Sequence, residues 1–105
     1  IRPLQRGHLL CVPKIEVDEL YELPKEAYDS LMSFSQRVAK ALKLSVPCQR
    51  IGSMVLGMEV PHAHIHLVPI NAESELSFAN GYLSFTQAEM LELASTISDA
   101  LDSVE

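Results

Sequence analysis

Cysteine, basic charge and long apolar runs are all scarce in this sequence. Its 105 residues include two cysteines, Cys11 and Cys48, which are too few for a disulfide framework. Eight lysines and arginines stand against 14 aspartates and glutamates, a formal net charge of −6, so neither nucleic acid nor an anionic membrane is expected as a partner. No apolar run approaches the roughly 18 residues of a membrane helix. These absences predict a protein of the reducing cytoplasm.

The composition is that of a globular protein. Hydrophobic residues make up 48% and charged residues 21% of the chain, which is typical of folded domains and too apolar for a disordered one. The length predicts a single domain over residues 1–105. Because the chain begins Ile1-Arg2-Pro3 without an initiator methionine, we expect that an N-terminal segment of the natural protein precedes it.

Two amphipathic helices are predicted. The first covers about residues 24–43, where apolar side chains recur at spacings of three and four. These side chains are Ala27, Leu31, Phe34, Val38 and Leu42. The second helix begins at Thr86-Gln87-Ala88-Glu89, which matches a capping box, and continues with helical spacing to about Val104.

Three short strands are predicted, at residues 8–13, 49–56 and 62–69. The first is almost entirely apolar, which is typical of a strand covered on both faces. Residues 71–85 read as irregular, with a hairpin-type Asn80-Gly81 pair. The order β-α-β-β-α with short connections predicts an α+β fold, in which two helices accompany an antiparallel sheet.

Three of the four histidines fall in one predicted strand, at His62, His64 and His66. Side chains alternate between the faces of a strand, so these three share one face with Cα atoms about 6.5–7 Å apart. The intervening apolar residues face the opposite way, into a core. Those residues are Ala63, Ile65 and Leu67. Histidine contributes little to strand packing, whereas its titration near neutral pH suits it to catalysis or metal binding.

The row of imidazoles has two functional interpretations. A metal site is one, although His62 and His66 are about 13 Å apart in an extended strand, too far to share an ion. No cysteine pair or His-Glu-x-x-His sequence completes such a site. In the other interpretation one imidazole is a nucleophile, because neutral imidazole attacks phosphorus well and its neighbours can stabilise phosphoryl oxygens.

The run His62-Ala63-His64-Ile65-His66-Leu67-Val68 resembles the histidine triad signature His-φ-His-φ-His-φ-φ, in which φ is apolar. Upstream, Gly57-x-Glu59-Val60-x-His62 is similar to the Gly-Gln-x-Val-x-His that leads into the triad. Ile1-x-Pro3 and Gly7-His8-x-Leu10-x-Val12-Pro13-Lys14 are similar to the family's Asp-Ile-x-Pro and Gly-His-x-Leu-Val-x-Pro-Lys. The resemblance to the histidine triad superfamily covers residues 1 to about 70.

This resemblance implies a nucleotide-binding fold and a homodimer. The family's enzymes cleave nucleotidyl conjugates at the α-phosphorus, without a cofactor in the chemical step. Their substrates are nucleoside phosphoramidates, adenylyl conjugates and dinucleoside polyphosphates, so the expected partner of this chain is a purine nucleotide. The product is a nucleoside monophosphate.

The resemblance also implies catalytic roles for four histidines. His64, the middle histidine, would attack phosphorus and form a nucleotidyl-histidine intermediate, which water then hydrolyses. His66 and His62 would hold the phosphate and orient the ring. His8 would lie beside the triad as an orienting partner.

The implied binding residues flank the triad in sequence. The run Gly57-Met58-Glu59-Val60 would contact the phosphate or the leaving group, and Ile1 and Leu10 would line the nucleoside pocket. The strand at 49–56 and the helix at 24–43 would supply the dimer contact.

The sequence departs from the family pattern at several positions. Met58 replaces the usual glutamine, which removes a side-chain donor, and the Asn-Gly loop before this turn is absent. Glu16 stands where many bacterial members have a zinc-binding histidine, so no metal is expected. The ribose-binding aspartate would precede Ile1. Two alternatives to the hydrolase therefore stay open: a non-catalytic purine nucleotide-binding dimer and a metal-dependent hydrolase that uses the histidine row.

Overall fold

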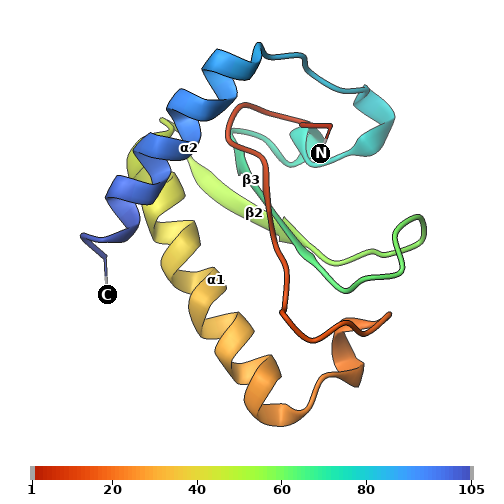
Figure 1. The fold of residues 1–105 in the computed structure, drawn as a ribbon. Helices are drawn as coiled ribbons and strands as arrows, with labels where there is room; N and C mark the ends of the chain where they lie inside the picture. The colour runs from red at the N-terminus through yellow and green to blue at the C-terminus, as the bar shows by residue number, and fades with distance from the viewer. Residues whose placement is uncertain (1, 105) are drawn as a thin grey trace.

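A computed structural model describes residues 2–104, which form one antiparallel sheet, two α-helices and short 3₁₀ turns (Figure 1). In chain order the strands and helices are β1 (Leu9–Cys11), α1 (Lys25–Ser45), β2 (Arg50–Met54), β3 (Ile65–Ile70) and α2 (Gln87–Leu101). The 3₁₀ turns cover Leu20–Glu22, Glu73–Glu75 and Phe78–Asn80. The predicted α+β class and the order of elements are confirmed, whereas a single domain over residues 1–105 stays a prediction.

The sheet has the order β1-β3-β2, with β3 antiparallel to both neighbours. Leu10 of β1 and Met54 of β2 both lie opposite His66 in the ladder. All six residues of β3 are buried, because a central strand is covered by its neighbours at both edges and by packing on both faces. This position places His66 at the centre of the sheet.

The predicted strands at 8–13, 49–56 and 62–69 are too long. The clearest difference is at the third strand, where His62 and His64 precede the first residue of β3. The backbone N–H of Ala63 donates to the carbonyl oxygen of Val17 at 2.8 Å rather than to a neighbouring strand. At Ala63 the chain therefore bonds to the segment before α1, and the ladder begins two residues later.

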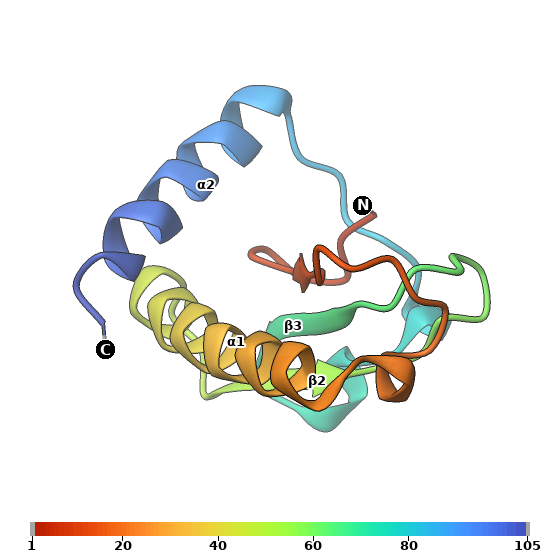
Figure 2. The ribbon, with the colours of Figure 1, turned by 60° about the horizontal axis from the view of Figure 1, so that its bottom comes forward.

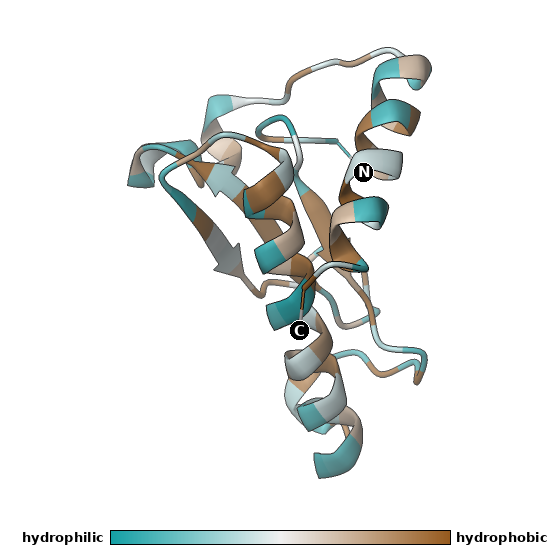
Figure 3. Ribbon diagram, turned by 90° about the vertical axis from the view of Figure 1, so that its left-hand side faces the viewer, coloured by the Kyte–Doolittle hydropathy of each residue, from teal (hydrophilic) through white to brown (hydrophobic). Residues whose placement is uncertain are grey.

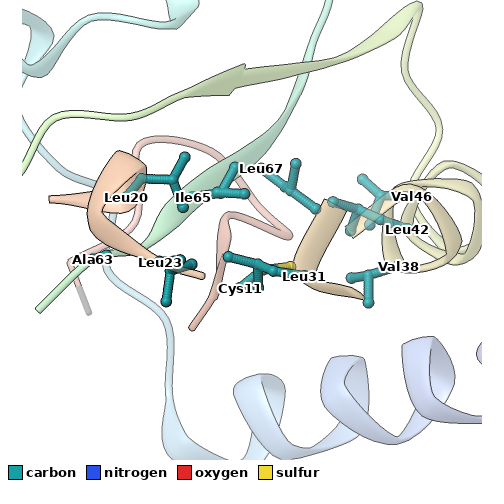
Figure 4. Packing of buried hydrophobic residues seen from close by; sticks show 10 residues of the cluster. All are labelled: Cys11, Leu20, Leu23, Leu31, Val38, Leu42, Val46, Ala63, Ile65 and Leu67. Atoms are coloured by element: carbon teal, nitrogen blue, oxygen red, sulfur yellow. The ribbon is translucent and has the colours of Figure 1, made fainter. Parts of the chain in front are cut away.

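The helix α1 covers one face of the sheet (Figure 2). Its buried stripe contains Leu31, Val38 and Leu42, which matches the predicted spacing, and its N-cap is Pro24. This stripe packs with the odd-numbered side chains of β3 in the main core. The labelled members of this core in Figure 4 are Cys11, Leu20, Leu23, Leu31, Val38, Leu42, Val46, Ala63, Ile65 and Leu67.

The opposite face of β3 carries His66, Val68 and Ile70. Val68 and Ile70 form a second cluster with Leu4 of the N-terminal arm, against which Phe78 packs from the segment after β3. The N-terminal arm and the chain after β3 therefore meet over this face of the sheet. A backbone hydrogen bond from Leu83 N–H to the Pro3 carbonyl oxygen, at 2.8 Å, joins the same two segments.

The segment between β3 and α2 contains no hairpin. Asn80 is the last residue of a 3₁₀ turn, and Gly81 caps that turn with φ of 79°. The Asn80-Gly81 pair was expected to act as a hairpin turn, but no strand flanks it here. Its backbone conformation ends a 3₁₀ turn instead.

The helix α2 starts at the predicted capping box. The Glu89 N–H donates to Thr86 Oγ1 at 3.1 Å, and the Thr86 N–H donates to Glu89 Oε1 at 2.9 Å. The helix packs on α1 and has no fully buried residue, and it stands apart from the sheet (Figure 2). Both helices carry hydrophobic and hydrophilic residues in alternation (Figure 3). Neither described helix combines the length and hydropathy needed to cross a membrane.

Gly7 is expected to be sensitive to added volume. It has φ of 92°, and a Cβ there would lie 3.0 Å from Pro69 Cγ, 3.0 Å from Val46 Cγ2 and 3.1 Å from Leu42 Cδ1. Gly81 also has a positive φ, 79°, but nothing lies within 4 Å of its Cβ position. We predict that Gly7→Ala lowers the free energy of unfolding by about 1–3 kcal/mol more than Gly81→Ala, because only the first also overpacks a core. Urea denaturation of both variants measures the difference, and equal losses would contradict the packing argument.

Candidate active site

A cavity of about 480 Å³ lies beside the histidines. It is lined by Arg2, His8, Leu10, Leu56, Gly57, Met58, Glu59, Val60, His64, His66, Phe78 and Tyr82. The lining includes three of the four catalytic candidates and the whole predicted phosphate loop. These residues come from the N-terminal arm, from β1 and β3, from the β2–β3 loop and from the segment after β3.

His8 and His66 form a hydrogen-bonded pair with defined tautomers. The Leu4 N–H donates to His8 Nδ1 at 2.9 Å, so this nitrogen is an acceptor and the neutral ring carries its proton on Nε2. His8 Nε2 then donates to His66 Nδ1, also at 2.9 Å. His66 Nδ1 is therefore an acceptor too, and the proton of His66 lies on Nε2. One backbone amide thus sets the proton positions of two imidazoles.

His64 has the opposite tautomer. Its Nδ1 lies 2.7 Å from the carbonyl oxygen of His62. A carbonyl oxygen only accepts hydrogen bonds, so Nδ1 carries the proton and Nε2 has a lone pair. The His64 ring is 4.9 Å from the His66 ring between centroids, with an interplanar angle of 70°. A ring with a lone pair on Nε2 and a ring with a proton on Nε2 are therefore neighbours.

His62 is the one histidine of the triad that does not line the cavity. Its Nε2 donates to the Pro13 carbonyl oxygen at 3.2 Å, and its own carbonyl oxygen orients His64. The His62 ring thus contacts Pro13, while the His62 backbone orients the His64 ring. The next residue, Ala63, is buried in the main core with Ile65, as the alternation predicts.

The two paired histidines resist protonation. Burial lowers the pKa of His8 from 6.5 to about 4, and the neighbouring His66 adds to the effect. Burial also lowers the pKa of His66, with a further contribution from His64. Both rings are therefore neutral at physiological pH, which the single-proton bond between them requires.

The β2–β3 loop forms an exposed rim of the cavity. Gly57 has φ of 105°, a conformation that favours glycine. The side chain of Met58 is 95% exposed, and Glu59 and Val60 are exposed as well. Leu10 lines the cavity from β1, and the predicted nucleoside contact at Ile1 lies outside the described residues.

Sequence reasoning missed an aromatic wall of the cavity. Phe78 meets the His66 ring edge-on at 5.5 Å, and Tyr82 lies 6.2 Å from Phe78. The Arg2 guanidinium stacks over Tyr82 at 4.3 Å from the ring centre. Phe78 and Tyr82 come from a segment without periodicity, so no pattern singled them out. Two aromatic residues four positions apart in a polar stretch are the only sequence signal they give.

Among residues 2–104, no group of three or more His, Cys, Asp and Glu side chains is placed to hold a metal ion. The two described cysteines, Cys11 and Cys48, are free thiols. Every buried side-chain nitrogen or oxygen in this part of the chain has a hydrogen-bond partner. Each of the four histidines thus bonds to another histidine or to a backbone group through at least one ring nitrogen.

The fold and the site define a histidine triad protein. Residues 1–73 match the model of the HIT domain family, and this match covers more than half of the chain. The protein therefore belongs to the HIT family, as the triad sequence indicated.

Two curated relatives are enzymes by name. Adenosine 5'-monophosphoramidase HNT1 of Saccharomyces cerevisiae is 37% identical over 71 residues, which are 66% of this chain and 44% of the yeast protein. The asymmetrical bis(5'-nucleosyl)-tetraphosphatase of Schizosaccharomyces pombe is 25% identical over 97 residues, 88% of this chain and 52% of the relative. The chain thus spans about half the length of these relatives.

Solved structures share the fold over nearly the whole chain. A HIT-like protein of Bartonella henselae involved in cell-cycle regulation has a TM-score of 0.80 at 24% identity, covering 95% of this chain and 75% of its own. A zinc-bound histidine triad family protein of Mycobacterium smegmatis has a TM-score of 0.74 at 27% identity, covering 100% and 78%.

The low pKa of His8 makes stability depend on pH. Between pH 4 and 6.5 the unfolded state binds a proton at this residue and the folded state does not, so the free energy of unfolding falls as the pH is lowered through this range. The slope is at most about 1.4 kcal/mol per pH unit for one such group. We predict a smaller slope in His8→Gln, measured by urea denaturation between pH 4 and 7. Magnetic resonance titration of the His8 ring protons tests the cause directly, and a midpoint near 6.5 would contradict it.

Proposed function

We propose that the protein is a hydrolase of nucleotidyl conjugates, in which His64 is the nucleophile that attacks the α-phosphorus. The observation that carries this proposal is the bond from His64 Nδ1 to the His62 carbonyl oxygen, which leaves the Nε2 lone pair available. Membership of the HIT family and the activities in the names of the two fungal relatives support it. The substrate class is nucleoside phosphoramidates, adenylyl conjugates or dinucleoside polyphosphates.

In the first step, the bond between Nε2 of His64 and phosphorus forms while the bond from phosphorus to the leaving group breaks. The leaving group keeps that electron pair and takes a proton from water. The imidazole now carries a positive charge, and the His62 carbonyl oxygen stabilises it by accepting from Nδ1–H. In the second step water attacks phosphorus, the electron pair returns to Nε2, and a proton and the nucleoside monophosphate are released.

His66 is proposed to hold the phosphate. Its Nε2–H is the proton that the His8 pair leaves free, and it can donate to a phosphoryl oxygen as charge develops there. His8 acts as a positioning residue, because it fixes both the tautomer and the orientation of His66. A neutral His66 keeps this donor at one defined atom.

The loop Gly57-Met58-Glu59-Val60 is proposed to contribute through its backbone. Met58 has no side-chain donor, so any hydrogen bond from this position to the phosphate comes from an N–H. Leu10 gives the cavity an apolar surface for a purine nucleoside, with its 37% exposed side chain.

The loss of a side-chain donor at Met58 also favours one alternative, a dimer that binds purine nucleotides without turning them over. This candidate keeps the cavity and the phosphate contact of His66 but lacks the hydrolytic step. Binding of adenosine monophosphate with no hydrolysis of adenosine phosphoramidate would favour it over the enzyme.

We predict that His64→Ala removes nearly all hydrolysis of adenosine phosphoramidate, by about three orders of magnitude or more, since it removes the bond-forming atom. Binding of adenosine monophosphate should survive, because the phosphate contacts come from other groups. His66→Ala should slow turnover less than His64→Ala does, and His62→Ala should have the smallest effect of the three. Turnover and calorimetric titration measure the two properties in each variant.

Trapping the intermediate gives a second measurement. With a phosphoramidate labelled in its nucleotide, acid-labile label is expected on the wild-type protein and not on His64→Ala. Turnover of His64→Ala near the wild-type rate would make the nucleophile assignment wrong.

Activity is expected to survive EDTA, and loss of activity with recovery on adding zinc would favour a metal-dependent hydrolase instead.

We also propose a homodimer, because the sheet has an edge strand that a second copy of the chain can pair with. The strand β2 is at the edge of the sheet, and exposed edges pair unless they are covered. On α1, Met32 and Phe34 are 41% and 44% exposed. We predict twice the monomer mass by light scattering at micromolar concentration and a shift towards monomer in Phe34→Glu. Tyr21→Glu, at a residue 78% exposed outside these elements, is the matched control, and a wild-type monomer would contradict the proposal.

A further inference from the structure

One wall of the cavity is built by two segments that lie about 80 residues apart in the sequence. Arg2 comes from the N-terminal arm, and Tyr82 follows the last 3₁₀ turn. The guanidinium lies 4.3 Å from the centre of the Tyr82 ring. The hydrogen bond from Leu83 N–H to the Pro3 carbonyl oxygen joins the residues next to both. The backbone therefore holds the stacked pair in place.

Arg2 is a cation without an ion-pair partner among residues 2–104, where the recorded salt bridge joins Lys25 and Asp29. Among the residues that the structure describes, it is the one lysine or arginine that lines the cavity, and Glu59 is the one carboxylate. In a chain with net charge −6, this places positive charge where the ligand binds. Stacking covers a face of the guanidinium and leaves its N–H groups free to donate to an anion.

The aromatic residues that support Arg2 lie outside the part of the chain that matches the HIT family model, which ends at residue 73. Phe78 and Tyr82 nevertheless join the triad to Arg2. The rings of His64, His66, Phe78 and Tyr82 follow one another at centroid distances of 4.9, 5.5 and 6.2 Å. This wall therefore combines Arg2, inside the matched range, with two aromatic residues that follow it.

We propose that Arg2, held on the Tyr82 ring, binds a second anionic group of the substrate, carried by the leaving group. The inference rests on the proposed hydrolase and narrows its substrates to conjugates whose leaving group is itself negatively charged. An in-line attack by His64 directs the leaving group away from that imidazole, and Arg2 lies at the other end of the row of rings that begins at His64. The anion is a phosphate of a polyphosphate chain or a carboxylate of an amino acid.

The test compares three adenosine substrates on the whole chain. Adenosine phosphoramidate has ammonia as its leaving group, diadenosine tetraphosphate has a polyphosphate, and the adenylyl conjugate of aspartate has carboxylates. Arg2→Gln is expected to lower kcat/KM at least about tenfold for one or both charged leaving groups and less than about twofold for ammonia. The substrate that responds distinguishes phosphate from carboxylate.

Matched variants separate the anion-binding role of Arg2 from a general effect of charge and from an effect on folding. Arg50→Gln removes the same charge from β2, outside the cavity lining, and should leave the ratio of the three kcat/KM values unchanged. Tyr82→Leu should lower kcat/KM for the charged leaving groups relative to that for ammonia. Tyr82→Phe should leave this ratio unchanged, because the aromatic ring supports the guanidinium. Equal losses for all three substrates in Arg2→Gln, or no loss for either charged one, would overturn the proposal.

A binding measurement tests the anion site separately from the hydrolase proposal. In His64→Ala protein, ADP is expected to bind about tenfold tighter than AMP, and adding Arg2→Gln should remove the difference. If no substrate is hydrolysed but this difference is found, the hydrolase proposal fails and the anion site stands. Equal affinities for ADP and AMP in the His64→Ala protein that retains Arg2 would overturn the anion site.

Discussion

The hydrogen bond between His8 and His66 is the contact on which the site depends. It joins the residue before β1 to the second residue of β3 at 2.9 Å, and both rings must be neutral for it to form. The Leu4 N–H decides which nitrogen of His8 accepts, and burial keeps the pKa of both rings low. A single backbone amide and an apolar surrounding thus determine which nitrogen of His66 carries the proton.

The period-two pattern of the triad predicted which side chains pack in the core, but its prediction that all three histidines share one face is wrong for His62, which does not line the cavity. Ala63, Ile65 and Leu67 are 3%, 4% and 4% exposed, as the pattern required. The start of β3 was not predictable, because it depends on a hydrogen bond from Ala63 to Val17, 46 residues away. The His62 ring bonds to the Pro13 carbonyl oxygen and does not line the cavity.

The helices were predicted well because local rules determine them. The capping box at Thr86 needs residues only three positions apart, and the stripe of α1 follows from its own spacing. The wall made by Arg2 and Tyr82 depends instead on how the chain after β3 returns to the N-terminal arm. No local pattern contains that information, so a site of this kind becomes visible only in the folded molecule.

The exposure of α2 has a consequence for how the protein opens. The helix has no fully buried residue and packs mainly on α1, whereas every residue of β3 is buried. Segments with few buried contacts open with a lower free energy than the core does. The amides of α2 can therefore exchange with solvent in a local unfolding that leaves the three strands and the histidines assembled.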